Sequence, residues 1–197
     1  LVKILENQKV DRVFCVPGES YLSVMNGLQE TSIETVLCKH EGAASIMTEA
    51  DGKLTGRPGI AFVTRGPGAT NAAIGIHTAR QDSNPVVMFV GQVPTNQLGL
   101  ESFQEINYSK MFGEVAKAVI EPLKPEDVSH ATAEALRVSV DGRPGPVIVP
   151  LPEDVGYGEL NQTQKHETIL RTAISPKSEA INSAAHLIEN SKHPVII

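Results

Sequence analysis

Short apolar runs alternate along the chain with stretches of helical period. Six runs rich in β-branched and aromatic residues predict strands at Arg12–Val16, Ile33–Cys38, Ile60–Thr64, Pro85–Val90, Val115–Ile120 and Val147–Pro150. These runs are continuously apolar, which is typical of strands buried on both faces of a parallel sheet. The pattern therefore predicts an α/β fold class, with a parallel sheet and helices on both of its faces.

Helical spacing and end signals fill the intervals between these strands. They predict helices at Ser20–Glu30, at Glu41–Thr55 before a Gly-Arg-Pro-Gly turn, from the glycines of Gly66-Pro67-Gly68 through Ala79, from Pro125 toward Asp141, and at Lys177–Asn190. The small residues of the third helix indicate close packing on the sheet.

The composition changes after Pro150-Leu151-Pro152, where a polar stretch without clear period begins. We expect a first domain over residues 1–155, a linker over 156–175, and the truncated start of a second α/β domain over 176–197. The chain opens within an amphipathic helical pattern and ends in an apolar run, so we expect a segment of a longer polypeptide.

Charge and hydropathy exclude several classes of protein. The 197 residues carry 17 Lys and Arg against 23 Asp and Glu, a net charge of -6, which offers no basic field for a nucleic-acid backbone. The apolar runs are far shorter than the roughly 20 residues that span a bilayer, and no signal pattern is visible. We expect a cytoplasmic protein. Cys15 and Cys38 lie inside apolar runs and are expected to be reduced core residues, with no metal-ligand spacing around them.

Common catalytic motifs are absent. The segment from Gly18 to Leu22 lacks the second glycine of a nucleophile elbow, and no zinc-protease helix or P-loop occurs. The segment Gly66-Pro67-Gly68-Ala69-Thr70-Asn71 has only the first two glycines of a dinucleotide fingerprint.

Four loops that follow predicted strands share one edge of the parallel sheet, where ligands of open α/β sheets bind. They contain Pro17-Gly18, Lys39-His40-Glu41-Gly42, Arg65-Gly66-Pro67-Gly68 and Gly91-Gln92-Val93-Pro94. Glu41 is the carboxylate beside a glycine-rich helix start. It is a candidate for proton transfer, and the structural alternative is a first-turn glutamate stabilised by the helix dipole.

These loops resemble the pyrimidine-binding domain of thiamine-diphosphate-dependent enzymes, most closely the acetolactate synthase-like group. The resemblance covers roughly residues 1–155 and is carried, in the family's order, by Phe14-Cys15-Val16-Pro17-Gly18, His40-Glu41-Gly42-Ala43-Ala44, Thr55-Gly56-Arg57-Pro58-Gly59, Gly66-Pro67-Gly68-Ala69-Thr70-Asn71, Asp82-Ser83-Asn84-Pro85, Gly91-Gln92-Val93-Pro94, Phe103-Gln104-Glu105 and Gly142-Arg143-Pro144-Gly145-Pro146-Val147.

The resemblance implies a role for each site residue. Glu41 would be catalytic, hydrogen-bonding a ring nitrogen of the cofactor's aminopyrimidine and so assisting removal of the thiazolium C2 proton. Pro17 and Gly18 would lie against the pyrimidine, and Gly66, Pro67, Gly68 and Asn71 would border the thiazolium and the substrate space. Phe103 and Gln104 match positions near the substrate, although a loop Phe is often a core residue. For His40, beside Glu41, we expect a role in orienting the backbone or in packing.

Arg65 departs from the family pattern, because acetolactate synthases usually have Ser before Gly-Pro-Gly. Glu19 departs too, since a Gly usually follows Pro-Gly there. Arg65 either meets a substrate carboxylate or forms an ion pair with Glu19 or Asp82.

As a whole, the resemblance implies the N-terminal portion of an enzyme that decarboxylates 2-oxo acids and then protonates or ligates the product, a lyase or transferase. Its cofactors would be thiamine diphosphate and Mg²⁺, the latter bound by a diphosphate-binding domain absent from this chain and contributed by another subunit of a homodimer or homotetramer. This segment alone would be inactive. Two alternatives stay open: a non-catalytic α/β assembly or regulatory module, and the pyrimidine-domain subunit of a split 2-oxo acid decarboxylase.

Overall fold

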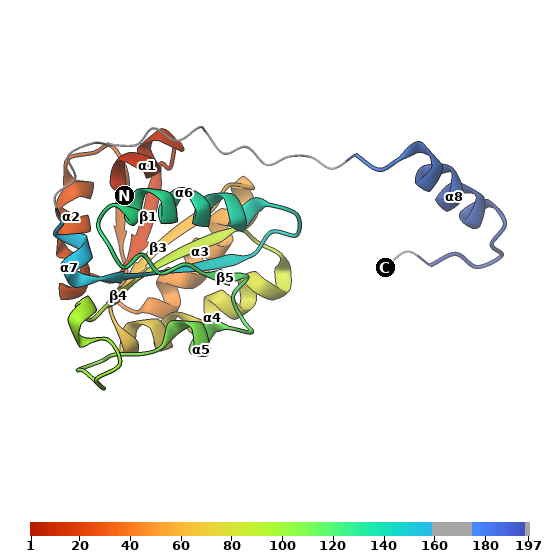
Figure 1. The fold of residues 1–197 in the computed structure, drawn as a ribbon. Coiled ribbons are helices and arrows are strands. Elements are labelled where there is room, and N and C mark those ends of the chain that lie inside the picture. Colours follow the sequence, from red (N-terminus) through yellow and green to blue (C-terminus); the bar gives the residue numbers. More distant parts are fainter. Residues whose placement is uncertain (159–174, 196–197) are drawn as a thin grey trace.

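One parallel sheet of six strands organises the chain (Figure 1). The computed structural model describes residues 1–158 and 175–195. The strands lie in the order β2-β1-β3-β4-β6-β5. Their bounds are β1 Arg12–Cys15, β2 Glu34–Leu37, β3 Gly59–Val63, β4 Val86–Gln92, β5 Ala118–Val119 and β6 Pro146–Pro152. The six predicted strands and their parallel arrangement are confirmed.

Helices cover both faces of this sheet, as predicted. On one face, α1 (Val2–Asn7), α2 (Leu22–Gln29) and α6 (Asp127–Val140) contribute to one buried cluster. On the other, α4 (Gly66–Asp82) and α5 (Tyr108–Phe112) contribute to a second, and α3 (Glu41–Thr55) packs against α4. The short elements are η1 (Glu19–Tyr21), η2 (Thr95–Gln97) and α7 (Glu153–Gly156).

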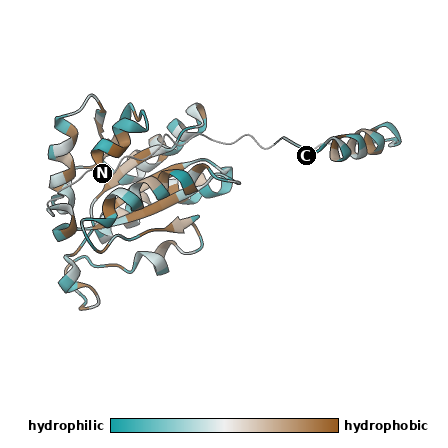
Figure 2. Ribbon diagram, turned by 45° about the horizontal axis from the view of Figure 1, so that its top comes forward, coloured by the Kyte–Doolittle hydropathy of each residue, from teal (hydrophilic) through white to brown (hydrophobic). Residues whose placement is uncertain are grey.

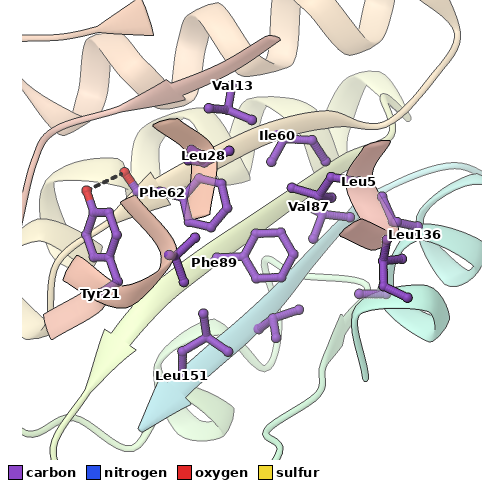
Figure 3. Close-up of a cluster of buried hydrophobic side chains, with 14 of the residues drawn as sticks. Leu5, Val13, Tyr21, Leu28, Ile60, Phe62, Val87, Phe89, Leu136 and Leu151 are labelled. Carbon is purple, nitrogen blue, oxygen red and sulfur yellow. Dashed lines mark hydrogen bonds between the residues drawn. The ribbon is translucent and has the colours of Figure 1, made fainter. Parts of the chain in front are cut away.

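The central strands carry the core, and they form the brown interior of Figure 2. Phe62 of β3 and Phe89 of β4 stack with ring centroids 4.8 Å apart, and Leu5 and Leu136 close over the same cluster (Figure 3). Burying one such side chain typically contributes about 1.5–3 kcal/mol. This packing holds β3 and β4 in place, and with them the loops that follow their carboxyl ends.

The strands β5 and β6 differ most in length from the prediction. The run Val115–Ile120 forms only the two-residue edge strand β5, while β6 continues to Pro152 in register with β4. Pro150 and Pro152 lie beyond the point where β5 ends, on a side of β6 where no ladder donor is needed, so the prolines are tolerated.

The C-terminal part contains α8 (Ser178–Glu189), which matches the predicted helix at Lys177–Asn190. Its residues are all exposed in the structure. The predicted linker and the final apolar run lie largely or partly outside the described residues, so the domain boundaries remain predictions. No helix within residues 1–158 and 175–195 is long and apolar enough to cross a membrane.

Candidate active site at the carboxyl edge of the sheet

Glu41 is the first residue of α3 and lies directly after the loop that follows β2. His40 caps this helix, because its Nδ1 accepts a hydrogen bond from the backbone N–H of Gly42 at 2.9 Å. The cap orients the first turn of the helix, the role expected of His40. The half-buried Glu41 carboxylate is thereby fixed at the edge of the sheet.

Asn71 of α4 reaches this carboxylate from the neighbouring helix. Its Nδ2 donates a hydrogen bond to Glu41 Oε2 at 3.0 Å. The two helices approach closely at Gly75, where an added Cβ would lie 2.6 Å from the Cβ of Ser45. Close packing of small residues, inferred from the sequence of this helix, thus brings Glu41 and Asn71 together.

Two glycine backbones pack closely against Thr64, which directly follows β3. A Cβ added at Gly18 would lie 2.7 Å from the Cβ of Thr64, and one added at Gly68 would lie 2.8 Å from its Cγ2 and 3.3 Å from Glu41 Oε1. Pro17 precedes Gly18 in the loop after β1, so the ends of β1 and β3 meet at Thr64. Sequence reasoning missed Thr64, although its place between a strand and Arg65-Gly66 was a usable signal.

A groove of about 460 Å³ opens beside the start of α4. It is lined by Gly66, Pro67, Thr70, Asn71, Gln104, Glu105 and Ile106. The backbone N–H of Gly66 donates to the carbonyl of Gln104 at 3.1 Å, so the two walls touch. The structure therefore brings Gly66, Pro67, Asn71 and Gln104 together. Phe103 is 78% exposed beside them, which contradicts a core role for this side chain.

The loop that carries Gln104 is held from within by Glu105. This carboxylate accepts hydrogen bonds from the backbone N–H groups of Gly99 at 2.5 Å and Ser102 at 3.0 Å. These N–H groups lower the pKa of Glu105 below its usual range. Gln104 itself has a φ of +64°, an unusual value for a side chain other than glycine.

Arg65 forms an ion pair, but not with either partner expected from the sequence. Its Nη2 lies 2.5 Å from Oε2 of Glu153 in α7, and Asp82 pairs instead with Lys53 at 2.7 Å. The expected pairing with Glu19 or Asp82 was therefore wrong. The cause is the strand order β3-β4-β6. Arg65 follows β3 and Glu153 follows β6, so the sheet brings these residues, 88 positions apart in the chain, into contact.

Tyr21 binds the backbone of the loop after β1 through its hydroxyl group. Its hydroxyl donates to the carbonyl of Val16, next to Pro17, and lies 3.4 Å from the carbonyl of Phe62 (Figure 3). Burial, together with the nearby Glu41 carboxylate, raises the pKa of Tyr21, so the hydroxyl stays a neutral donor. Sequence reasoning did not single out Tyr21.

The two cysteines are both free, and they differ in burial. Cys15 is buried and free, as predicted, whereas Cys38 is free but only partly buried. Burial raises the pKa of the Cys15 thiol to about 11, so it is not a reactive thiolate. Within the described ranges, no group of three or more His, Cys, Asp or Glu residues is arranged to hold a metal ion.

Comparison with known proteins identifies the family to which this chain belongs. Residues 1–111 match the family described as thiamine pyrophosphate enzyme, N-terminal TPP binding domain, and the chain belongs to this family. The family resemblance inferred from the motifs is confirmed.

Acetolactate synthases are among its curated relatives. The whole chain is 35% identical over 204 residues to the probable acetolactate synthase large subunit of Methanocaldococcus jannaschii. It is 36% identical over 200 residues to the acetolactate synthase large subunit of Corynebacterium glutamicum, and 31% identical over 198 residues to the acetolactate synthase of Bacillus subtilis. The chain spans 34%, 32% and 35% of these relatives, about a third of their length.

The donor set at the edge fits the aminopyrimidine of thiamine diphosphate. Glu41 presents a carboxylate that would hydrogen-bond a ring nitrogen of this group, and Asn71 hydrogen-bonds that carboxylate. The Gly18 and Gly68 backbones pack so closely against Thr64 that neither position has room for a side chain, and a flat ring at this edge would therefore meet backbone there.

Proposed function

We propose that this chain is the pyrimidine-binding part of a thiamine-diphosphate-dependent enzyme that acts on 2-oxo acids, by decarboxylation followed by protonation or carboligation. The observation that carries the proposal is the Glu41 carboxylate, fixed between a capped helix start and Asn71 at the edge where the family binds its cofactor. The names of the curated relatives favour acetolactate synthase-like chemistry.

When bound, thiamine diphosphate would supply a thiazolium ring able to act as a carbon nucleophile toward a 2-oxo acid. Glu41 holds a proton at the pyrimidine ring nitrogen, and returns it, as a general acid and base. Asn71 keeps the Glu41 carboxylate in one orientation, so that the proton moves along a fixed direction. Pro17 and Gly18 would form the surface against the pyrimidine ring.

The groove beside Gly66, Pro67 and Asn71 is the proposed substrate side of this site, with Gln104 in its wall and Phe103 at its rim. Arg65 directly precedes Gly66 of this groove in the chain and carries a positive charge. Its Nη2 binds Glu153 and its Nε is buried, so Nη1 is the nitrogen that would meet a substrate carboxylate.

The enzyme would need further parts that this chain does not contain. We place Mg²⁺ and the diphosphate in a separate domain, from a partner subunit of a homodimer or homotetramer in the cytoplasm. In support, α3 and α4 expose apolar side chains on neighbouring helices: Ile46 at 39%, Met47 at 37%, Leu54 at 86% and Ile74 at 61%. An apolar face of this kind marks a protein interface. The segment alone would be inactive.

The proposal is tested on the full-length enzyme. Purified protein, stripped of cofactor, is supplied with pyruvate or 2-oxobutyrate, and release of CO₂ is measured with and without thiamine diphosphate and Mg²⁺. We expect release that depends on both. A full-length protein that binds the cofactor but leaves every 2-oxo acid unchanged would contradict the proposed chemistry. Absence of cofactor binding would favour an assembly or regulatory module.

A further inference from the structure

Two neighbouring acids at the start of α7 bind two different loops of the site. Glu153 Oε2 accepts a hydrogen bond from Arg65 Nη2. Asp154 accepts two hydrogen bonds from Thr95: Oδ1 from the backbone N–H at 3.0 Å, and Oδ2 from the hydroxyl at 2.6 Å. Arg65 precedes the Gly66 wall of the groove, and Thr95 begins the loop that carries Gln104.

The topology explains why one short helix reaches both loops. Strands β3, β4 and β6 are adjacent in the sheet, so their carboxyl ends lie side by side. The β6 strand is paired with β4 along its full length, from Pro146 to Pro152, and α7 follows without a break. Glu153 and Asp154 are therefore anchored to the rigid centre of the sheet, whereas the loops they bind are irregular.

The Arg65–Glu153 pair is less exposed than the ion pairs elsewhere on this part of the molecule. The Arg65 and Glu153 side chains are 16% and 27% exposed, against 56% and 44% for Lys53 and Asp82. Arg65 Nε is buried and has no hydrogen-bond partner among the described residues. Because a partly buried guanidinium is destabilised when its acid is removed, Glu153 determines where this side chain lies.

We propose that Glu153 and Asp154 are positioning residues of the groove: they hold its Gly66 wall and its 95–105 wall at a fixed separation without touching the ligand. Glu153 acts through Arg65, and Asp154 acts through Thr95. The consequence for turnover rests on the proposed function. The tether itself does not, and it is measured separately.

Hydrogen exchange on the full-length protein tests the tether. In Glu153→Gln we expect backbone amides of residues 65–70 to exchange about 10-fold faster or more, since a hydrogen bond to a charged group is lost. In Asp154→Asn the same change is expected at residues 94–100 instead. Asp82→Asn, which breaks an exposed pair at the other end of α4, is the matched control and should accelerate neither segment. Unchanged exchange in both segments, or an equal rise across the whole domain, would overturn the tether.

Steady-state kinetics then tests positioning. Misplacing a binding wall by about 1 Å can reduce the rate by 10²-fold, so we expect kcat to fall by about 10- to 100-fold in Glu153→Gln. Glu153→Asp, which keeps the acid, should recover part of the rate, and Asp82→Asn should match the wild type. Faster exchange at residues 65–70 with unchanged kcat would overturn the positioning role. A wild-type enzyme without thiamine-diphosphate-dependent turnover would contradict the proposed function instead, and exchange would still decide the tether.

Discussion

The side-chain amide of Asn71 lies 3.0 Å from Oε2 of Glu41, and this hydrogen bond joins the second turn of α4 to the first residue of α3. Both residues stand where helices leave the carboxyl edge of the sheet. Glu41 is thus not a solitary first-turn carboxylate stabilised only by the helix dipole. A neighbouring side chain fixes its orientation.

Replacing Asn71 with Ala should slow turnover without unfolding the protein. A hydrogen bond to a charged group is worth about 1.5–3 kcal/mol, and exposure of this pair reduces that value, so we expect kcat to fall by about 3- to 10-fold. Steady-state kinetics of the full-length enzyme measures the effect, with Thr78→Ala on the same helix as the control. An unchanged kcat in Asn71→Ala would mean that orientation of Glu41 is immaterial.

Gly68→Ala should weaken cofactor binding, because the new Cβ would lie 2.8 Å from Thr64 Cγ2 and 3.3 Å from Glu41 Oε1. Removing the methyl group in the double variant Gly68→Ala, Thr64→Ser should restore part of the affinity. Gly145→Ala is the matched control, since its Cβ would be in ordinary contact, 3.4 Å from the Cβ of Lys117. Calorimetry of cofactor binding checks all three, and equal affinity in Gly68→Ala and Gly145→Ala would contradict the prediction.

The strand pattern was predictable because strands buried on both faces are continuously apolar. Glu41 was predictable as a candidate because a lone carboxylate follows a strand and precedes a glycine. The partner of Arg65 was not, since Glu153 is distant along the chain and meets Arg65 only through the order β3-β4-β6. Local patterns carry no information about strand order. Tyr21 and Thr64 were missed for the same reason: their roles come from contacts between separate strand ends.

Arg65→Ser should discriminate between substrates if the guanidinium binds a substrate carboxylate. Loss of such a charge-assisted bond costs about 1.5–3 kcal/mol, so kcat/KM for a 2-oxo acid acceptor should fall by roughly 10- to 150-fold more than that for an uncharged aldehyde acceptor, which loses only the contribution of the Arg65–Glu153 pair. Equal losses on the charged and the neutral acceptor would contradict direct contact with substrate. They would leave Arg65 with its role as the partner of Glu153.

The 95–105 loop should lose its hydrogen bonds in acid. Backbone N–H groups of Gly99 and Ser102 lower the pKa of Glu105 below its ordinary 4.5. Burial alone would raise the pKa of Asp154, but hydrogen bonds from Thr95 outweigh it and bring the pKa below 3.8. For acids with a lowered pKa, the stabilisation is fully present above the ordinary value and is lost as pH falls through the lowered one.

NMR spectra of the amide protons of Gly99 and Ser102 check this pH dependence. Their chemical shifts should titrate with a midpoint below pH 4.5 and level off at higher pH. In Glu105→Gln this titration should disappear. A midpoint above 4.5 in the wild type would contradict the assignment of Glu105 as the anchor of the loop.

The central claim is that Glu41 moves the proton that activates the cofactor, and exchange of the C2 hydrogen of enzyme-bound thiamine diphosphate for deuterium tests it most directly. In the full-length enzyme, Glu41→Gln should bind the cofactor and remain folded, yet exchange C2 about 10²- to 10⁴-fold more slowly, the usual contribution of a general acid or base. Glu19→Gln, an exposed acid at the same edge, should exchange at the wild-type rate. An unchanged rate in Glu41→Gln would remove Glu41 from the mechanism.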